Sequence, residues 1–215
     1  MITILHEDAD LLVADKPAGL TTIPGHAQGL PTLRETLEAQ VGQRLFVVHR
    51  LDKAVSGAIV FARHAEAHRH LSLQFEHRHV EKTYLALAHG RVPQTAGTID
   101  APLRKFGSGR MGVDARRGKP SQTRYRVQRG TSAYTLLHAF PLTGRRHQLR
   151  VHFYHLGHPL VGDPLYGDAA LRTGYPRLYL HALRLRCTHP AGHPLDVKAP
   201  PPPAFTDLVE ALLRG

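Results

Sequence analysis

The chain has 215 residues, of which 42% are hydrophobic, 21% charged and 7% aromatic. This balance supplies enough apolar side chains for a core and excludes wholesale disorder, a collagen-like repeat and a coiled coil. The sequence contains neither a membrane-length apolar run nor the pattern of a signal peptide, and its single cysteine, Cys187, cannot form an intrachain disulfide. We therefore expect a soluble, cytoplasmic, monomeric protein that has no membrane partner.

The net charge of +11 is concentrated in one segment. Residues 101–150 contain twelve basic residues and a single acid, Asp114, whereas the rest of the chain has equal numbers of basic and acidic residues. Arginine outnumbers lysine 22 to 6, and the guanidinium fork suits bidentate phosphate contacts and stacking on bases. A general excess of arginine would not be confined to one stretch, so the charge favours a nucleic-acid partner.

Hydrophobic periodicity predicts many short strands and a few helices. The predicted strands, in chain order, are residues 2–6, 10–16, 45–49, 57–62, 80–90, 133–140 and 179–187. The predicted helices are residues 31–42, 64–77 and 147–156, and a short helix from Phe205. Residues 17–29 form a Pro/Gly-rich loop, and residues 104–120 form an exposed basic loop. We therefore expect an α+β fold around a mixed, mostly antiparallel sheet with flanking helices.

Residues 49–57, with the sequence HRLDKAVSG, form a polar turn between two apolar strands. A carboxylate in such a turn is held rigidly and is partly desolvated, which suits Asp52 to act as a nucleophile or a base. Taken alone, the same pattern also fits a turn aspartate that accepts backbone N–H bonds and does no chemistry. Other motifs along the chain are needed to choose between the two interpretations.

Several such motifs follow one another in order. They are KPAGL at 16–20, HRLD at 49–52, YLA at 84–86, LTGRRHQLR at 142–150, HPLVGD at 158–163 and YG at 166–167. With them, the chain resembles the RluA-type pseudouridine synthase family over almost its whole length. Val55 departs from the family pattern, which has Thr at this place, so a hydroxyl beside the turn is absent. The chain starts directly on the catalytic domain, so we expect residues 1–215 to form one such domain without a separate N-terminal RNA-binding domain.

The resemblance implies a fold with a central RNA-binding cleft and an activity, the isomerisation of uridine in ribosomal or transfer RNA. The N1–C1′ bond breaks and C5 then bonds to C1′, and the reaction implies no cofactor and no metal. By resemblance, Asp52 is the catalytic carboxylate, either as the nucleophile or as the base that removes a sugar proton. Tyr84 would lie against the uracil and serve acid/base chemistry, and Arg150 would pair with Asp52, with Arg145 as the alternative partner.

The remaining expected site residues bind the RNA. Arg50 would fill the gap that the uridine leaves when it flips out of its stack. Arg145 and His147 would contact the substrate from the LTGRRHQLR segment. In the basic loop, Arg116, Arg117 and Lys119 would clamp phosphates.

Two alternatives of other classes remain. A non-catalytic RNA-binding protein, such as a ribosome-assembly factor, would keep the basic segment and tolerate the loss of Asp52. A histidine-metal hydrolase would use the ligand-like spacings of His64, His68 and His70, or of His77 and His79. These histidines have no acidic or cysteine partner at the companion spacing, so we expect no metal site.

Overall fold

The computed structural model describes residues 1–24 and 31–214, so residues 25–29 of the predicted loop lie outside the described part. The chain divides into two compact units. Unit 1 comprises Met1–Lys82 and Ala182–Pro200, and unit 2 comprises Thr83–His181 and the chain from Pro201 onward. In the described part of the chain, no helix is long and apolar enough to cross a membrane.

Unit 1 is built on a sheet whose strands run in the order β1, β2, β4, β11, with β3 beside β4 and β12 beside β11. The pairs β1/β2, β2/β4, β3/β4 and β11/β12 are antiparallel. The strands are β1 (Thr3–Glu7), β2 (Leu11–Lys16), β3 (Phe46–Val47), β4 (Ser56–Ala62), β11 (Leu180–Thr188) and β12 (Pro194–Lys198).

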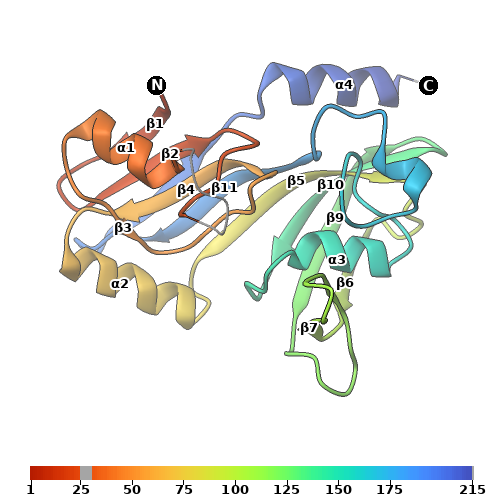
Figure 1. The fold of residues 1–215 in the computed structure, drawn as a ribbon, viewed down its shortest axis with the longest axis horizontal. Coiled ribbons are helices and arrows are strands. Elements are labelled where there is room, and N and C mark those ends of the chain that lie inside the picture. Colours follow the sequence, from red (N-terminus) through yellow and green to blue (C-terminus); the bar gives the residue numbers. More distant parts are fainter. Residues whose placement is uncertain (25–30, 215) are drawn as a thin grey trace. The chain divides into compact units, whose positions relative to one another are not determined.

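Helices α1 (Leu33–Val41) and α2 (Ala65–Glu76) lie on opposite sides of this sheet (Figure 1). All seven residues of β4 are buried, as a strand covered on both faces requires. α2 packs Ala67 and Leu71 into a core with the apolar side chains of β2, β4 and β11. α1 starts at a capping box and ends at Gly42 in the left-handed conformation, so both of its ends are specified locally.

Unit 2 has a second group of antiparallel strands in the order β5, β10, β9, β6, and a separate two-stranded sheet of β7 and β8. The strands are β5 (Glu81–His89), β6 (Ala96–Asp100), β7 (Leu103–Lys105), β8 (Met111–Val113), β9 (Gln122–Gly130) and β10 (Tyr134–Pro141). The helices are α3 (Gln148–His155), the short 3-10 helix η1 (Ala169–Arg172) and α4 (Pro203–Leu213).

The side chains of β10 alternate between the two faces of these strands, and this alternation places α3 and α4 on opposite faces. Leu136 belongs to a core with Phe205 and Val209 of α4. Ala139 points the other way and pairs with Tyr125, whose ring meets Phe153 of α3 at 5.9 Å between centroids. The face that carries Ala139 is therefore the α3 face of unit 2.

The expected α+β fold with a mostly antiparallel sheet is confirmed. The expected basic loop at 104–120 is only partly right, because β7 and β8 form a hairpin there and Leu103 bridges to Lys119. The strand expected at 45–49 is reduced to Phe46–Val47. The sequence does not predict strands β6, β9 and β12, because glycine, proline and charged residues interrupt their hydrophobic pattern.

Candidate active site

Asp52 lies half-buried in the turn that precedes β4 in unit 1. Its carbonyl oxygen accepts the Val55 N–H at 3.0 Å, which closes the turn. The next carbonyl, that of Lys53, accepts the Gly19 N–H at 2.8 Å and the Lys16 Nζ at 3.1 Å. The backbone on the C-terminal side of Asp52 is therefore tied at two successive peptide groups, which fixes the position from which its carboxylate extends.

The N-terminal side of the turn is fixed through Leu51. This side chain is buried, and the Thr22 hydroxyl contacts both of its backbone groups: Oγ1 donates to the Leu51 carbonyl at 3.1 Å and accepts the Leu51 N–H at 3.3 Å. Arg50, directly before it, is exposed. Arg50 and Asp52 thus extend from the two sides of one buried anchor residue.

Lys16 is fully buried, and its ammonium group ties the KPAGL segment to this turn. Nζ donates to the carbonyls of Pro17 at 2.8 Å, Leu20 at 2.7 Å and Lys53 at 3.1 Å. A buried ammonium needs such acceptors, because desolvation without them would be costly. The sequence shows the KPAGL motif but not this role, which depends on a carbonyl 37 residues away.

His49, in the same turn, contacts β4 and α2 through a neutral ring. Its Nε2 accepts the Val60 N–H at 3.1 Å, and the ring stacks on Phe75 at 4.5 Å. Burial, with a smaller effect of the Lys82 charge, lowers the pKa of His49 to about 3. At neutral pH the ring therefore carries no charge and acts as a hydrogen-bond acceptor for β4.

Two further positions around the turn require small or apolar side chains. Val55 is 3% exposed, so the residue that departs from the family pattern occupies an apolar site. Gly57 has φ +111°, and a Cβ added there would lie 2.3 Å from the Ala182 carbonyl oxygen. Only glycine fits at this close approach of two backbones.

In unit 2, Tyr84 lies half-buried on β5. It pairs with Ala139 of β10, which in turn pairs with Tyr125 of β9. Tyr84 therefore extends from the α3 face of these strands.

Arg150 of α3 forms a buried, two-pronged ion pair with Asp163. Nε donates to Oδ2 and Nη2 to Oδ1, both at 2.7 Å, and the two residues are 3% and 1% exposed. Asp163 Oδ1 also accepts the backbone N–H groups of Leu165 and Tyr166. A guanidinium has five donors, so this pair is compatible with the expected contact between Arg150 and Asp52, which stays a prediction.

Tyr166 joins two of the predicted site residues of unit 2. Its hydroxyl lies 2.8 Å from His147 Nδ1 and accepts the Met111 N–H at 3.1 Å. The Arg150 guanidinium lies 5.1 Å from the centre of its ring. The sequence places Tyr166 in a motif but does not reveal this bridging role, and the same is true of Asp163.

Arg145 is held less firmly than Arg150. It is half-exposed, its backbone N–H donates to Gln148 Oε1 at 3.0 Å, and its Nε reaches the Pro120 carbonyl at 3.4 Å. The backbone around Arg145 is thus ordered by the start of α3, whereas its side chain lies at the surface.

The basic residues after β8 extend from a turn organised by Asp114. Its Oδ1 accepts the N–H groups of Arg116 at 3.0 Å and Arg117 at 2.9 Å, and Oδ2 accepts Arg104 Nη1 at 2.8 Å. The side chains of Arg116, Arg117 and Lys119 are exposed. The single acid of residues 101–150 therefore holds the backbone of the turn, and the three cations remain at the surface.

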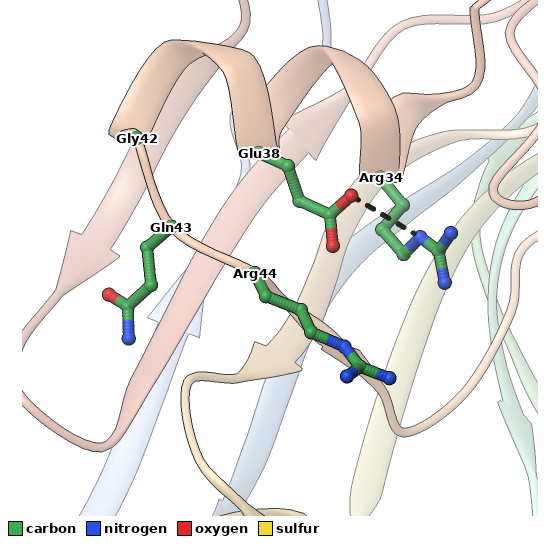
Figure 2. A pocket seen from close by; sticks show the side chains of 5 residues that line it. All are labelled: Arg34, Glu38, Gly42, Gln43 and Arg44. Atoms are coloured by element: carbon green, nitrogen blue, oxygen red, sulfur yellow. Dashed lines mark ion pairs between the residues drawn. The ribbon is translucent and has the colours of Figure 1, made fainter.

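A cavity of about 570 Å³ lies elsewhere in unit 1, at the C-terminal end of α1 (Figure 2). Arg34, Glu38, Gly42, Gln43 and Arg44 line it. Glu38 neutralises part of its charge, because its Oε2 lies 3.7 Å from Arg34 Nε while Oε1 accepts the Leu45 N–H. None of the predicted site residues lines this cavity.

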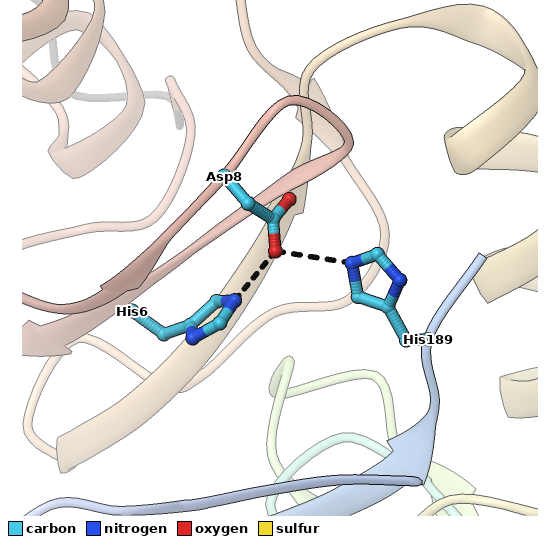
Figure 3. Close-up of side chains that lie close together, drawn as sticks. All are labelled: His6, Asp8 and His189. Atoms are coloured by element: carbon cyan, nitrogen blue, oxygen red, sulfur yellow. Dashed lines mark hydrogen bonds and ion pairs between the residues drawn. The ribbon is translucent and has the colours of Figure 1, made fainter. Parts of the chain in front are cut away.

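Figure 3 shows His6, Asp8 and His189, whose possible ligand atoms all lie within 4.8 Å of one another. Asp8 Oδ2 contacts His6 Nε2 at 2.5 Å and His189 Nε2 at 3.0 Å. His189 Nδ1 accepts the Ala191 N–H at 3.0 Å, so the proton that the ring donates to Asp8 lies on Nε2. In a metal-bound histidine the nitrogen that faces the metal carries no proton, and the other ring nitrogen is the donor. The cluster therefore fits a set of hydrogen bonds, called here the Asp8 pin, that joins the β1/β2 turn to the end of β11.

Comparisons with known proteins identify the family of this chain. Residues 10–155 match the family described as RNA pseudouridylate synthase. The human protein RNA Pseudouridylate Synthase Domain Containing 1 superposes with a TM-score of 0.82 at 30% identity, covering 100% of this chain and 96% of that protein. The chain therefore belongs to the RNA pseudouridine synthases, the enzymes that isomerise uridine in RNA to pseudouridine.

Within this family the chain is similar to bacterial RluA-type enzymes, as the sequence motifs predict. It is 39% identical to the dual-specificity RNA pseudouridine synthase RluA of Escherichia coli strain K12, over 93% of each chain. It is 41% identical to the ribosomal large subunit pseudouridine synthase D of Nitrosomonas europaea, over 98% of this chain. The match spans 65% of the length of that second relative. These relatives do not favour the non-catalytic alternative.

Removing the carboxylate of the buried ion pair should destabilise unit 2. We expect Asp163→Asn to lower the free energy of unfolding by about 3 kcal/mol, because Arg150 Nε and Nη2 lose their buried counter-charge. The matched control is Asp196→Asn, which weakens the exposed pairs with Arg184 and Arg186 and should cost less than about 1 kcal/mol. Urea unfolding checks both variants, and equal losses would contradict the structural role of Asp163.

The Asp8 pin should make the stability of the protein sensitive to acid. Burial alone would raise the pKa of Asp8, but hydrogen bonds from His6, Leu11 and Asp10 and the charge of His189 lower it to about 2. The resulting stabilisation is complete above the ordinary value of 3.8 and disappears as the pH falls towards 2.

We therefore expect Asp8→Asn to be less stable than wild type by about 1–2 kcal/mol at pH 7, with the difference closing between pH 4 and pH 2. Urea unfolding across this range measures it. Asp207→Asn, the same substitution at an exposed position of α4, is measured in parallel as the control. A constant difference between Asp8→Asn and wild type would rule out the titration.

Proposed function

We propose that this chain isomerises specific uridines in ribosomal or transfer RNA, with Asp52 as the catalytic carboxylate and without a cofactor or metal. The observation that carries the proposal is the anchoring of the Asp52 turn, where Lys16, Thr22 and Val55 hold consecutive backbone groups. These groups fix the backbone on both sides of Asp52, which orients its carboxylate as a catalytic group requires.

In the proposed reaction, Asp52 either attacks C1′ of the ribose or removes a sugar proton to give a glycal, and the N1–C1′ bond breaks. The uracil turns while it remains bound, C5 bonds to C1′, and the C5 proton is replaced by one on N1, so that no atoms enter or leave overall. Tyr84 lies against the uracil and passes a proton through its phenol. Its position on the α3 face of unit 2, the face that also holds Arg150, supports this role.

Arg150 is the proposed cationic partner of Asp52. Its burial and its two bonds to Asp163 support the assignment, because a pinned guanidinium presents its charge without losing side-chain freedom at each turnover. Arg145, the alternative partner, is half-exposed and less firmly held. We therefore assign Arg145, together with His147, to substrate binding.

The exposed basic side chains are the proposed RNA contacts. Arg50 fills the gap left by the flipped uridine, and Arg116, Arg117 and Lys119 contact phosphates. The exposure of all four residues supports these roles, and the localised charge of residues 101–150 further supports the phosphate contacts of Arg116, Arg117 and Lys119. We further propose that the chain works as a single catalytic domain and as a cytoplasmic monomer.

Asp52→Asn tests the catalytic assignment. We expect isomerisation to fall by at least about 100-fold, because the amide keeps the shape of the side chain and loses its charge, while RNA affinity and stability stay close to wild type. The measurement is single-turnover pseudouridine formation on ribosomal and transfer RNA from cells that lack the protein. Asp207→Asn is the control that should keep full activity. A variant with a tenth of wild-type turnover would exclude Asp52 as the catalytic group.

Replacing Arg116, Arg117 and Lys119 by Ala tests the phosphate clamp. We expect weaker RNA binding and a plot of log affinity against log salt that is flatter by about 2, because each single-strand phosphate that a side chain no longer neutralises reduces the slope by roughly 0.7. The control removes the same charge through Arg44→Ala, Arg69→Ala and Arg91→Ala, all at exposed positions outside the basic segment. Equal changes in the two triple variants would show a non-specific effect of net charge.

A further inference from the structure

A second cavity, of about 260 Å³, lies entirely within unit 2. It is bounded by β8 and the residue before it, by the C-terminal end of α3, and by the segment that runs into η1. Five of its lining side chains carry its polar and aromatic character, namely Arg110, Tyr154, His155, Tyr166 and Arg172. No carboxylate is among the residues that line it.

Tyr154 presents an aromatic ring to solvent at this cavity. It is 46% exposed, whereas Phe153 and His152, its neighbours on α3, are fully buried. Its ring centre lies 6.4 Å from that of Tyr166 at an interplanar angle of 41°. The fold therefore does not need most of this ring for packing, and its surface is available to a flat ligand.

Two arginines accompany the exposed ring. Arg172 Nε is shielded from water and has no hydrogen-bond partner, which is costly for a charged donor. The Arg110 guanidinium lies 5.9 Å from the centre of the Tyr166 ring, and its Nη2 donates to the Leu165 carbonyl. An aromatic surface flanked by two cations is the arrangement that binds an unstacked base together with its phosphate.

We propose that this cavity binds a second nucleotide of the RNA substrate, with its base against Tyr154 and its phosphate at Arg110 and Arg172. The proposal rests on the proposed function only in that the ligand is RNA. The proximity of the cavity to the basic segment in the chain supports the proposal. Arg110 belongs to that segment. Val113, which also lines the cavity, directly precedes the Asp114 turn that carries Arg116 and Arg117.

The site would also be linked to the groups proposed for catalysis. Tyr166 lines the cavity, its hydroxyl bonds to His147, and Arg150 lies over its ring. A nucleotide in the cavity would therefore restrict the motion of a residue that packs against Arg150. RNA that fills the cavity would hold this part of unit 2 in one arrangement.

The experiment uses the full chain and an oligouridylate 12-mer that carries 5-iodouridine as a photo-crosslinking base. We expect Tyr154→Ala to bind it roughly 5- to 150-fold more weakly, as the loss of one stacked base predicts, and Tyr154→Phe to stay within about twofold of wild type. Arg172→Gln should weaken binding and reduce the salt slope by about 0.7. The wild-type crosslink should map to Tyr154.

The matched controls are Leu73→Ala, at another exposed apolar side chain, and Arg69→Gln, which loses one exposed charge on α2. If Tyr154→Ala binds like Leu73→Ala, or if the crosslink maps outside the cavity, the proposal is overturned. Uridine monophosphate and inorganic phosphate are titrated separately. If either one alone binds at this site as tightly as the 12-mer, the ligand is a free nucleotide or a free anion and the RNA assignment fails.

These measurements are separate from the test of the catalytic function. Asp52→Asn should keep both the 12-mer affinity and the Tyr154 crosslink, because neither depends on the chemical step. Failure of the wild-type protein to isomerise RNA, with an intact crosslink, would contradict the proposed catalysis and leave the nucleotide site standing. Full isomerisation by Tyr154→Ala, with unchanged binding of the 12-mer, would contradict the nucleotide site alone.

Discussion

The buried ammonium group of Lys16 holds together the part of unit 1 that carries Asp52. Its three carbonyl acceptors come from two separate segments, two from the KPAGL loop and one from the Asp52 turn. Burying this charge is unfavourable by itself, and the carbonyl acceptors offset that cost. The three hydrogen bonds therefore favour the relative position of the loop and the turn in which all of them form.

In unit 2 a buried charge also fixes the geometry of the chain, but its partner is a carboxylate instead of backbone carbonyls. Arg150 and Asp163 form a buried ion pair, although apolar side chains of similar size would stabilise a core at least as well. What an ion pair adds is direction, because the fork of the guanidinium donates to both carboxylate oxygens in one orientation. The left-handed Gly162 before Asp163 serves the same end, since a Cβ there would lie 1.8 Å from the Arg177 carbonyl oxygen.

The sequence predicts the groups proposed for chemistry better than the groups that position them. The Asp52 turn is recognisable because the residues around it are contiguous and lie between two apolar strands. Asp163 and Tyr166 meet Arg150 and His147 only after the chain has folded back over 13 and 19 residues. The sequence does not reveal the β7/β8 hairpin either, because a three-residue strand shows too little alternation to be distinguished from a loop.

In the proposed function, buried charges serve catalysis and exposed charges serve recognition. The buried charges contact protein atoms, so they set geometry and leave little freedom to adapt to different RNAs. Asp114 uses its carboxylate to hold its own turn, and for this reason the cations that follow it remain at the surface, where salt weakens them and a phosphate can reach them. Discrimination between RNA targets should therefore depend on side chains such as Arg116, Arg117 and Tyr154, which can change without disturbing the anchored residues around Asp52 and Arg150.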